Sequence, residues 1–185
     1  MRWMFVDERI DYTGEQLRSH WILERFGIAG DAIVSFLGRC DVGFEEMVDL
    51  ADVLEGKPIK SELMLHFIAE HFDPDIERAI LRQRLFISII VEELNRMLGR
   101  PVFLRRGDDI YDGDRKLSVS IATCSPVSSL MHTGLNVTAK GAPVRAAGLE
   151  DYEVDPRQLA EAVMRRYVEE MEGVGAAKVK VRWVR

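Results

Sequence analysis

A lysine and a pair of acidic residues flank a tight turn near the middle of the chain. The segment Asp112-Gly113-Asp114 is a turn signature, because glycine adopts a positive φ at little cost. Asp108 and Asp109 precede this turn, and Lys116 follows it at the start of an apolar strand. An amine there can hydrogen-bond a carboxylate or acyl carbonyl, or neutralise a phosphate, and paired acids can orient it or hold a metal. A solvated hairpin rich in charged turn residues is the alternative interpretation.

A histidine and two small or polar residues follow on a later stretch. His132, Gly134 and Asn136 lie within residues 130–137, which have the composition of a strand. Together with the lysine hairpin, this stretch suggests one particular site, in which a lysine that recognises an acyl group lies beside a histidine on an adjoining strand.

Helices that would position these strands are predicted from apolar periodicity and from start and stop signals. The clearest runs from Pro74 to Leu98, with Asp75 and Glu77 in its first turn and a glycine after its end. Further helices are predicted over residues 14–26, 44–54 and 156–172.

Strands are predicted over residues 4–6, 31–37, 62–72, 102–104, 117–123, 130–137 and 177–184. Residues 62–72 also fit a helix, but the strand is favoured because Phe72-Asp73-Pro74 follows as a stop signal. Loops of hairpin length dominate the middle of the chain. The predicted fold class is therefore α+β, with a mixed, mainly antiparallel sheet packed by helices, and residues 1–185 are expected to form a single domain.

The order of three of these pieces resembles the biotin and lipoate protein ligase superfamily, including its octanoyltransferase branch. A long helix precedes Asp108-Asp109-Ile110, then comes Arg115-Lys116-Leu117, and later Gly134-Leu135-Asn136-Val137. In that superfamily a helix is followed by Asn/Asp-Asp-Ile/Leu, Gly-x-Lys-Leu/Ile and Gly-Ile-Asn-Val elements in the same order. The resemblance covers roughly residues 77–137 and is interpreted as an archaeal branch of the superfamily. It implies a fold related to class II aminoacyl-tRNA synthetase catalytic domains.

The resemblance also implies roles for individual residues. Lys116 matches the lysine that contacts the acyl carbonyl or the acyl-adenylate, and Asp109 matches the acid before the hairpin. His132, Gly134 and Asn136 resemble the His/Gly/Asn group of the octanoyltransferases, with a spacing that differs by a residue or two.

Departures from the superfamily pattern weigh against its known reactions. Biotin ligases carry an Arg/Gly-rich phosphate loop, whereas residues 40–52 of this chain are acidic and would repel phosphate unless a metal intervenes. Octanoyltransferases use a cysteine where this chain has Ala147. Cys124 or Cys40 could replace that nucleophile if the fold brings either thiol beside Lys116. Burial as a small apolar side chain is the alternative for each.

Other polar residues allow two interpretations. Arg106 and its neighbour Arg105 could clamp an anionic ligand or simply flank a strand. No metal site is predicted, because the strand interpretation divides the following residues between two faces: Glu62, His66, Glu70 and His71.

The composition of the chain indicates which kinds of partner and which compartment are expected. With 25 Lys+Arg against 31 Asp+Glu, the net charge of −6 makes binding to a nucleic-acid backbone unfavourable. No apolar run of about 18 residues could span a membrane, and no early segment resembles a signal peptide. Two distant cysteines fit a reducing compartment, so a cytoplasmic protein is expected. The sequence specifies neither a cofactor nor an oligomeric state.

The sequence thus predicts a protein that binds a small acyl or carboxylate ligand, with Lys116 contacting the acyl group. If the protein is an enzyme, the expected activity is that of an acyltransferase or ligase, with a carrier protein as one candidate acceptor. A non-catalytic ligand-binding module on the same fold is the alternative, because the phosphate loop and the thiol are both missing. A nucleic-acid-linked, synthetase-like domain is a third, less favoured by the charge.

Overall fold

The computed structural model describes residues 1–56, 59–140 and 145–184. Its main sheet is built from these strands: β1 (Arg2–Phe5), β2 (Ala32–Val42), β3 (Ile59–His71), β7 (Ser118–Cys124) and β8 (Ser129–Asn136). Their order is β1-β2-β3-β8-β7, with β1 parallel to β2 and the other neighbours antiparallel. A smaller antiparallel sheet contains β4 (Leu104–Arg106), β5 (Asp109–Asp112) and β6 (Arg115–Lys116).

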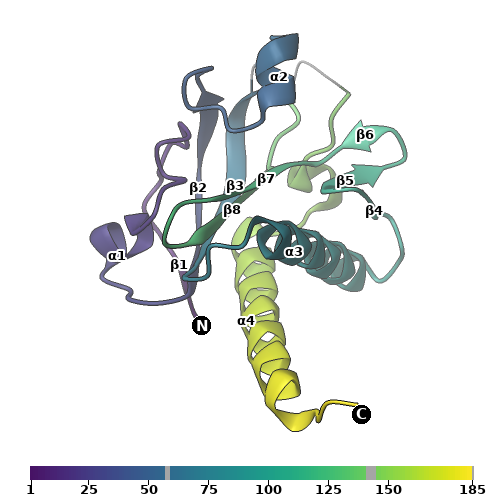
Figure 1. Ribbon diagram of the computed structural model, residues 1–185. Coiled ribbons are helices and arrows are strands. Elements are labelled where there is room, and N and C mark those ends of the chain that lie inside the picture. The colour runs from purple at the N-terminus through teal and green to yellow at the C-terminus, as the bar shows by residue number, and fades with distance from the viewer. Residues whose placement is uncertain (57–58, 141–144, 185) are drawn as a thin grey trace.

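Two long helices pack on one face of the main sheet, as Figure 1 shows. The helices are α1 (Trp21–Phe26), α2 (Leu50–Glu55), α3 (Ile76–Leu98) and α4 (Pro156–Lys180), with a 3-10 turn at Leu149–Tyr152. The side chain of Asp75 accepts a hydrogen bond from the Arg78 N–H, and Gly99 ends α3 with φ 65°. These signals confirm the helix predicted from Pro74 to Leu98. The mixed, mainly antiparallel sheet packed by helices also agrees with the predicted fold class.

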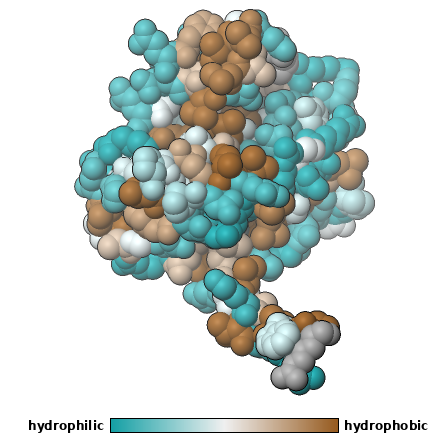
Figure 2. All heavy atoms as spheres, viewed as in Figure 1, coloured by the Kyte–Doolittle hydropathy of each residue, from teal (hydrophilic) through white to brown (hydrophobic). Residues whose placement is uncertain are grey.

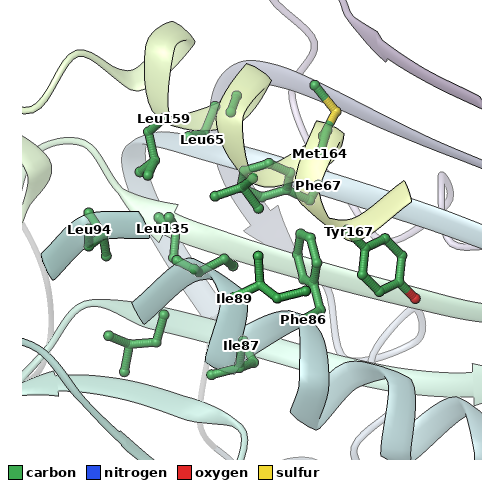
Figure 3. Packing of buried hydrophobic residues seen from close by; sticks show 14 of the residues in the cluster. Leu65, Phe67, Phe86, Ile87, Ile89, Leu94, Leu135, Leu159, Met164 and Tyr167 are labelled. Carbon is green, nitrogen blue, oxygen red and sulfur yellow. The ribbon is translucent and has the colours of Figure 1, made fainter. Parts of the chain in front are cut away.

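The main core lies between the sheet and these two helices. Leu65 and Phe67 of β3 and Leu135 of β8 pack against Phe86 of α3 and Tyr167 of α4 (Figure 3). All are at most 1% exposed. The face of the sheet that these helices cover is therefore fully packed.

The opposite face of β3 carries Met64, His66 and Ile68, in the alternation that a strand imposes. Met64 and Ile68 belong to a second apolar cluster with Phe36 of β2 and Tyr12 of the preceding segment. The strand interpretation of residues 62–72 is therefore confirmed, and this face carries the cavity described below.

The short helix α1 shows that the helix predicted over residues 14–26 was wrong in its first half. His20 adopts a left-handed conformation with φ 67°, and its backbone N–H donates to the carboxylate of Glu70 at 3.0 Å. Gly14 has φ 100°. Because a positive φ interrupts an α-helix, the helix begins only at Trp21.

The prediction over residues 44–54 was also too long, since α2 begins at Leu50. The Asp49 side chain accepts hydrogen bonds from the backbone N–H groups of Ala51 and Asp52, and thereby caps the helix at this point. Several apolar side chains near α2 are exposed, including Leu50 and Leu54. Figure 2 shows apolar surface at this end of the molecule.

The strand predicted over residues 177–184 was wrong. Helix α4 continues through Lys180, and residues 181–184 have no regular structure. Alternating Lys and Val residues suggested a strand, but a strand needs a partner, whereas an existing helix gains one hydrogen bond for each residue added. Figure 1 shows this end of α4 projecting away from the sheet. No helix within the described ranges is long and apolar enough to cross a membrane.

Candidate functional site

A cavity of about 250 Å³ lies on the face of the sheet opposite α3 and α4. Val119 and Ile121 of β7 line its floor, while Tyr12 and Met47 line it from the segments that cover this face. Lys116 lies at the same cavity, where the small sheet joins β7. The cavity thus combines apolar side chains with one lysine and several carboxylates, and it is large enough for a small organic ligand.

The lysine and the acid singled out in the sequence form an ion pair. Lys116 Nζ lies 2.8 Å from Asp109 Oδ2, and both side chains contribute to the cavity lining. They come from β6 and β5, which are joined by the two-residue turn predicted at Gly113, whose φ is 60°. Burial raises the pKa of Asp109, although the adjacent ammonium group lowers it. The Lys116 side chain is 32% exposed, so its amine can reach a ligand.

The neighbouring acid, Asp108, is held away from this pair by α3. Its carboxylate accepts hydrogen bonds from Arg84 at 3.2 Å and from Gln83 at 3.4 Å. Ser120, which also lines the cavity, accepts a hydrogen bond from Gln83 at 2.7 Å and donates to the Asp108 carbonyl at 2.9 Å. The serine hydroxyl is therefore committed to structure and is not a free nucleophile.

His132 lines the same cavity and belongs to a buried aromatic stack. The ring of Tyr12 lies parallel to it with the ring centroids 3.7 Å apart. His132 Nε2 lies 3.1 Å from His66 Nδ1, and His66 Nε2 lies 3.3 Å from the carbonyl oxygen of Gly38. Burial lowers the pKa of His66 to about 4 and lowers the pKa of His132 well below its usual value. Both rings are therefore neutral at neutral pH.

Lys116, Asp109 and His132 are thus brought to one cavity, but the other proposed contact residues are not. An added Cβ at Gly134 would lie 2.9 Å from Met64 Cε, so this glycine makes room for a core side chain. Asn136 accepts a hydrogen bond from Ser61 at 3.4 Å and donates one to the Ala147 carbonyl at 3.3 Å. Both residues support the strand pairing instead of lining the cavity.

The arginine and the two cysteines also lie elsewhere. The guanidinium of Arg106 stacks over the ring of Tyr111 at 5.0 Å. Cys124 ends β7, about 20 Å from its beginning at the usual rise per residue, so this thiol is far from Lys116. Cys40 is 1% exposed within the second apolar cluster, and burial raises its pKa to about 12. Neither free thiol replaces the missing nucleophile beside Lys116.

Acidic residues dominate the charge around the cavity. Among the described residues that line it, five carry carboxylates and one is a lysine: Glu46, Asp49, Asp52, Asp108, Asp109 and Lys116. The acidic segment noted in the sequence therefore forms part of the cavity lining. Within the described ranges, no three His, Cys, Asp or Glu residues are arranged to hold a metal. Anionic ligands are disfavoured here, and neutral ligands are not.

The sequence did not reveal that Tyr12 lines the cavity or that His66 contacts His132 behind it. In the sequence, His66 was considered as a metal ligand, and that role was rejected. Its place beside Met64 and Ile68 on one face of the strand indicated burial. Its contact with His132 could not be predicted locally, because the two residues are 66 positions apart in the sequence.

The sheet and its covering helices define the class, a biotin/lipoate ligase-like fold. A biotin protein ligase from Aquifex aeolicus, in complex with biotin and ATP, has a TM-score of 0.62 at 17% identity over 92% of this chain and 70% of that one. A lipoate-protein ligase A bound with ATP has a TM-score of 0.57 at 20% identity over 93% and 86% of the two chains. These likenesses establish the fold alone.

The chain belongs to the family described as "Domain of unknown function (DUF366)", whose model matches residues 1–182. Uncharacterized protein MJ0805 of Methanocaldococcus jannaschii is 44% identical over 157 residues, which are 80% of this chain and 69% of that protein. A protein of unknown function from Pyrococcus horikoshi has a TM-score of 0.95 at 46% identity over 100% of both chains. The predicted resemblance to biotin and lipoate protein ligases is thus confirmed as a shared fold, and the relatives of this chain include an uncharacterised archaeal protein, as expected.

Proposed function

We propose that this protein binds a small acyl ligand in the cavity, with the Lys116 amine donating a hydrogen bond to the acyl carbonyl oxygen. The observation that carries this proposal is the Lys116–Asp109 pair, 2.8 Å apart, beside an apolar floor that suits a hydrocarbon chain. Asp109 orients the amine. Further support comes from the shared fold, on which a biotin protein ligase is described in complex with biotin.

The acyl group is bound in a neutral form, as an amide, ester or thioester, in preference to a free carboxylate. Asp109 already neutralises Lys116, and the further acidic residues of the lining leave the cavity negative. A carboxylate ligand would be repelled by these acidic side chains, because Lys116 is already paired with Asp109 and cannot fully neutralise the ligand. ATP phosphates would meet the same repulsion, so adenylation is not part of the proposal.

The side chains that line the cavity favour ligand binding without catalysis. Within the described part of the cavity lining there is no cysteine, and the Ser120 hydroxyl is engaged at both its donor and its acceptor positions. Transfer to a carrier protein would therefore need the nucleophile to come from the carrier. The two unpaired cysteines fit a reducing cytoplasm, which we retain as the proposed location.

A thermal-shift screen tests this function. The probes are biotin, lipoate and octanoate, the amide and the adenylate of each, and ATP with and without Mg²⁺. We expect the amides to stabilise the protein more than the free acids do. Lys116→Met should abolish the shift, whereas Lys178→Met, at an exposed position on α4, should preserve it.

Absence of a shift with every probe would overturn the proposed function. Incubation of the protein with an acyl amide or thioester and an acceptor carrier protein, followed by mass spectrometry, separates binding from transfer. An unchanged carrier mass is expected of a binding module, and an acylated carrier would instead assign an acyltransferase.

A further inference from the structure

A chain of hydrogen bonds fixes the proton positions of His132 from a backbone carbonyl buried behind it. A carbonyl oxygen only accepts hydrogen bonds, so His66 Nε2 must carry the proton that it donates to the Gly38 oxygen, 3.3 Å away. In a neutral imidazole the other nitrogen is then bare, and His66 Nδ1 is an acceptor. His132 Nε2, 3.1 Å from that atom, must therefore be the donor.

The remaining nitrogen of His132, Nδ1, is consequently a bare acceptor. The residue lines the cavity although it is only 3% exposed, and no group of the described residues pairs with its Nδ1. Tyr12 stacks flat on the ring, with an interplanar angle of 6°, and the contact of His132 Nε2 with His66 Nδ1 fixes which edge of the ring is left for a ligand. Among the described residues, only Thr133 Oγ1 is a fully buried side-chain N or O atom without a partner, so the unpaired Nδ1 keeps access to the cavity, where a donor group of a ligand can bind it.

We infer that the ligand of this cavity carries a neutral N–H or O–H donor at the end remote from its acyl group, and that His132 Nδ1 accepts this hydrogen bond. The inference rests on the proposed function, in which Lys116 binds the acyl end. His66 acts through His132 and is a positioning residue. It imposes the tautomer that favours a ligand ending in a donor over one ending in an acceptor or in a plain methyl group.

The sheet geometry requires an elongated ligand for this role. Ile121 pairs directly with His132, and Lys116 lies five positions earlier along the same path. At the usual rise per strand residue, the backbones of Lys116 and Ile121 are at most about 16 Å apart, since β6 and β7 belong to different sheets. The lysine and histidine side chains shorten this span, so a medium-length chain with a polar group at each end fits the separation.

The tautomer can be measured without any ligand. Long-range ¹H–¹⁵N correlation spectra of the histidine rings distinguish a protonated nitrogen from a bare one. We expect His66 and His132 both to be protonated at Nε2 and bare at Nδ1 at neutral pH. A His132 ring protonated at Nδ1 would overturn the inference while leaving the role of Lys116 untouched.

Ligand selectivity is tested with two matched series of medium-chain fatty amides, one ending in a hydroxyl and the other in a methyl group. We expect the hydroxyl series to bind about tenfold more tightly, the effect of one net hydrogen bond. Equal affinity of the two series would overturn the donor requirement alone. Failure of both series to bind the folded protein would overturn the proposed function itself.

Two variants separate positioning from folding. His66→Phe keeps an aromatic ring in the stack but cannot hold the tautomer of His132, so the preference for the hydroxyl series should fall while binding of the methyl series persists. Thr133→Val is the matched control, because Thr133 lies next to His132 on the opposite face of β8 and its buried hydroxyl has no partner in the described structure. It should leave the preference unchanged. Preserved preference in His66→Phe would contradict the positioning role.

Discussion

At the scale of residues, the site is defined by two polar side chains that differ in charge and burial. Lys116 forms an ion pair with Asp109 at the edge of the cavity, whereas His132 is buried and neutral. Each of these conditions has a measurable consequence.

Removing the charge of Asp109 should change which form of ligand binds. In Asp109→Asn the lysine charge is no longer neutralised, so binding of free octanoate should improve, on the order of tenfold, relative to octanamide. Titration calorimetry measures the ratio of the two affinities. Asp114→Asn, at the exposed tip of the same hairpin, is the control and should leave the ratio unchanged. A ratio that fails to move in Asp109→Asn would show that this carboxylate does not set the charge preference.

The buried histidines make stability depend on pH. Burial lowers the pKa of His66 from 6.5 to about 4, and His132 shifts in the same direction. The unfolded chain therefore binds protons that the folded chain does not as the pH falls below 6.5. The free energy of unfolding should decrease across this window, by about 3 kcal/mol for His66 alone, and should not change above it on account of these groups.

Urea unfolding measured above and within this window checks the slope. His66→Phe removes one titrating group, so its free energy of unfolding should fall less steeply with pH than that of the unsubstituted protein. Identical slopes for the two proteins would mean that His66 is not held neutral by burial.

At the scale of elements, strand β2 supports both the sheet and the histidine chain. Its pairing with β3 shifts register between Gly38 and Cys40. The segment before α1 runs alongside, since the Ile10 N–H donates to the Leu37 carbonyl at 3.0 Å. Gly38 allows this close approach, because an added Cβ would lie 1.9 Å from the Ile10 carbonyl oxygen.

Gly38→Ala should therefore displace the segment that carries Tyr12 and disturb the carbonyl that fixes His66. We expect a loss of about 3 kcal/mol in the free energy of unfolding, the upper part of the usual range for overpacking. Gly43→Ala is the matched control, since nothing lies within 4 Å of its added Cβ. Denaturant unfolding compares the two variants, and equal stabilities would contradict the close packing at Gly38.

At the scale of the whole molecule, the sheet separates the core under the long helices from the face that carries the second apolar cluster and the cavity. Helices α3 and α4 cover one face with a continuous apolar core, and the cavity opens on the other. The outer part of α4 lies beyond this core, with Val179 83% exposed. Stability is therefore expected to depend on the first half of α4 and not on its end.

Leu159→Ala should cost about 2–5 kcal/mol, because this side chain is fully buried against the sheet. Val179→Ala should change stability by no more than about 0.5 kcal/mol. Thermal or urea unfolding of the two variants tests this difference. A large loss in Val179→Ala would show that the end of α4 has a packing partner in solution.

The parts of this molecule that local signals control were predictable. Helix α3 begins after its cap Asp75 and ends at its cap Gly99. Gly113 forms the turn that brings Lys116 near Asp109. The helix over residues 14–26 was overestimated because a distant carboxylate, Glu70, captures the His20 N–H. Propensity within that segment contains no information about such a partner.

The sequence by itself determined the residue types, the acidic balance, the lysine hairpin and the order of elements that indicates the fold. Only the tertiary structure decided which side chains share the cavity. In the structure, Cys124 lies at the far end of β7 and Asn136 donates a hydrogen bond to the Ala147 carbonyl instead of lining the cavity. His66 contacts His132. The physical reason is strand register. A side chain's face and its partner depend on pairing between distant segments, and a shift of one residue would reverse every face.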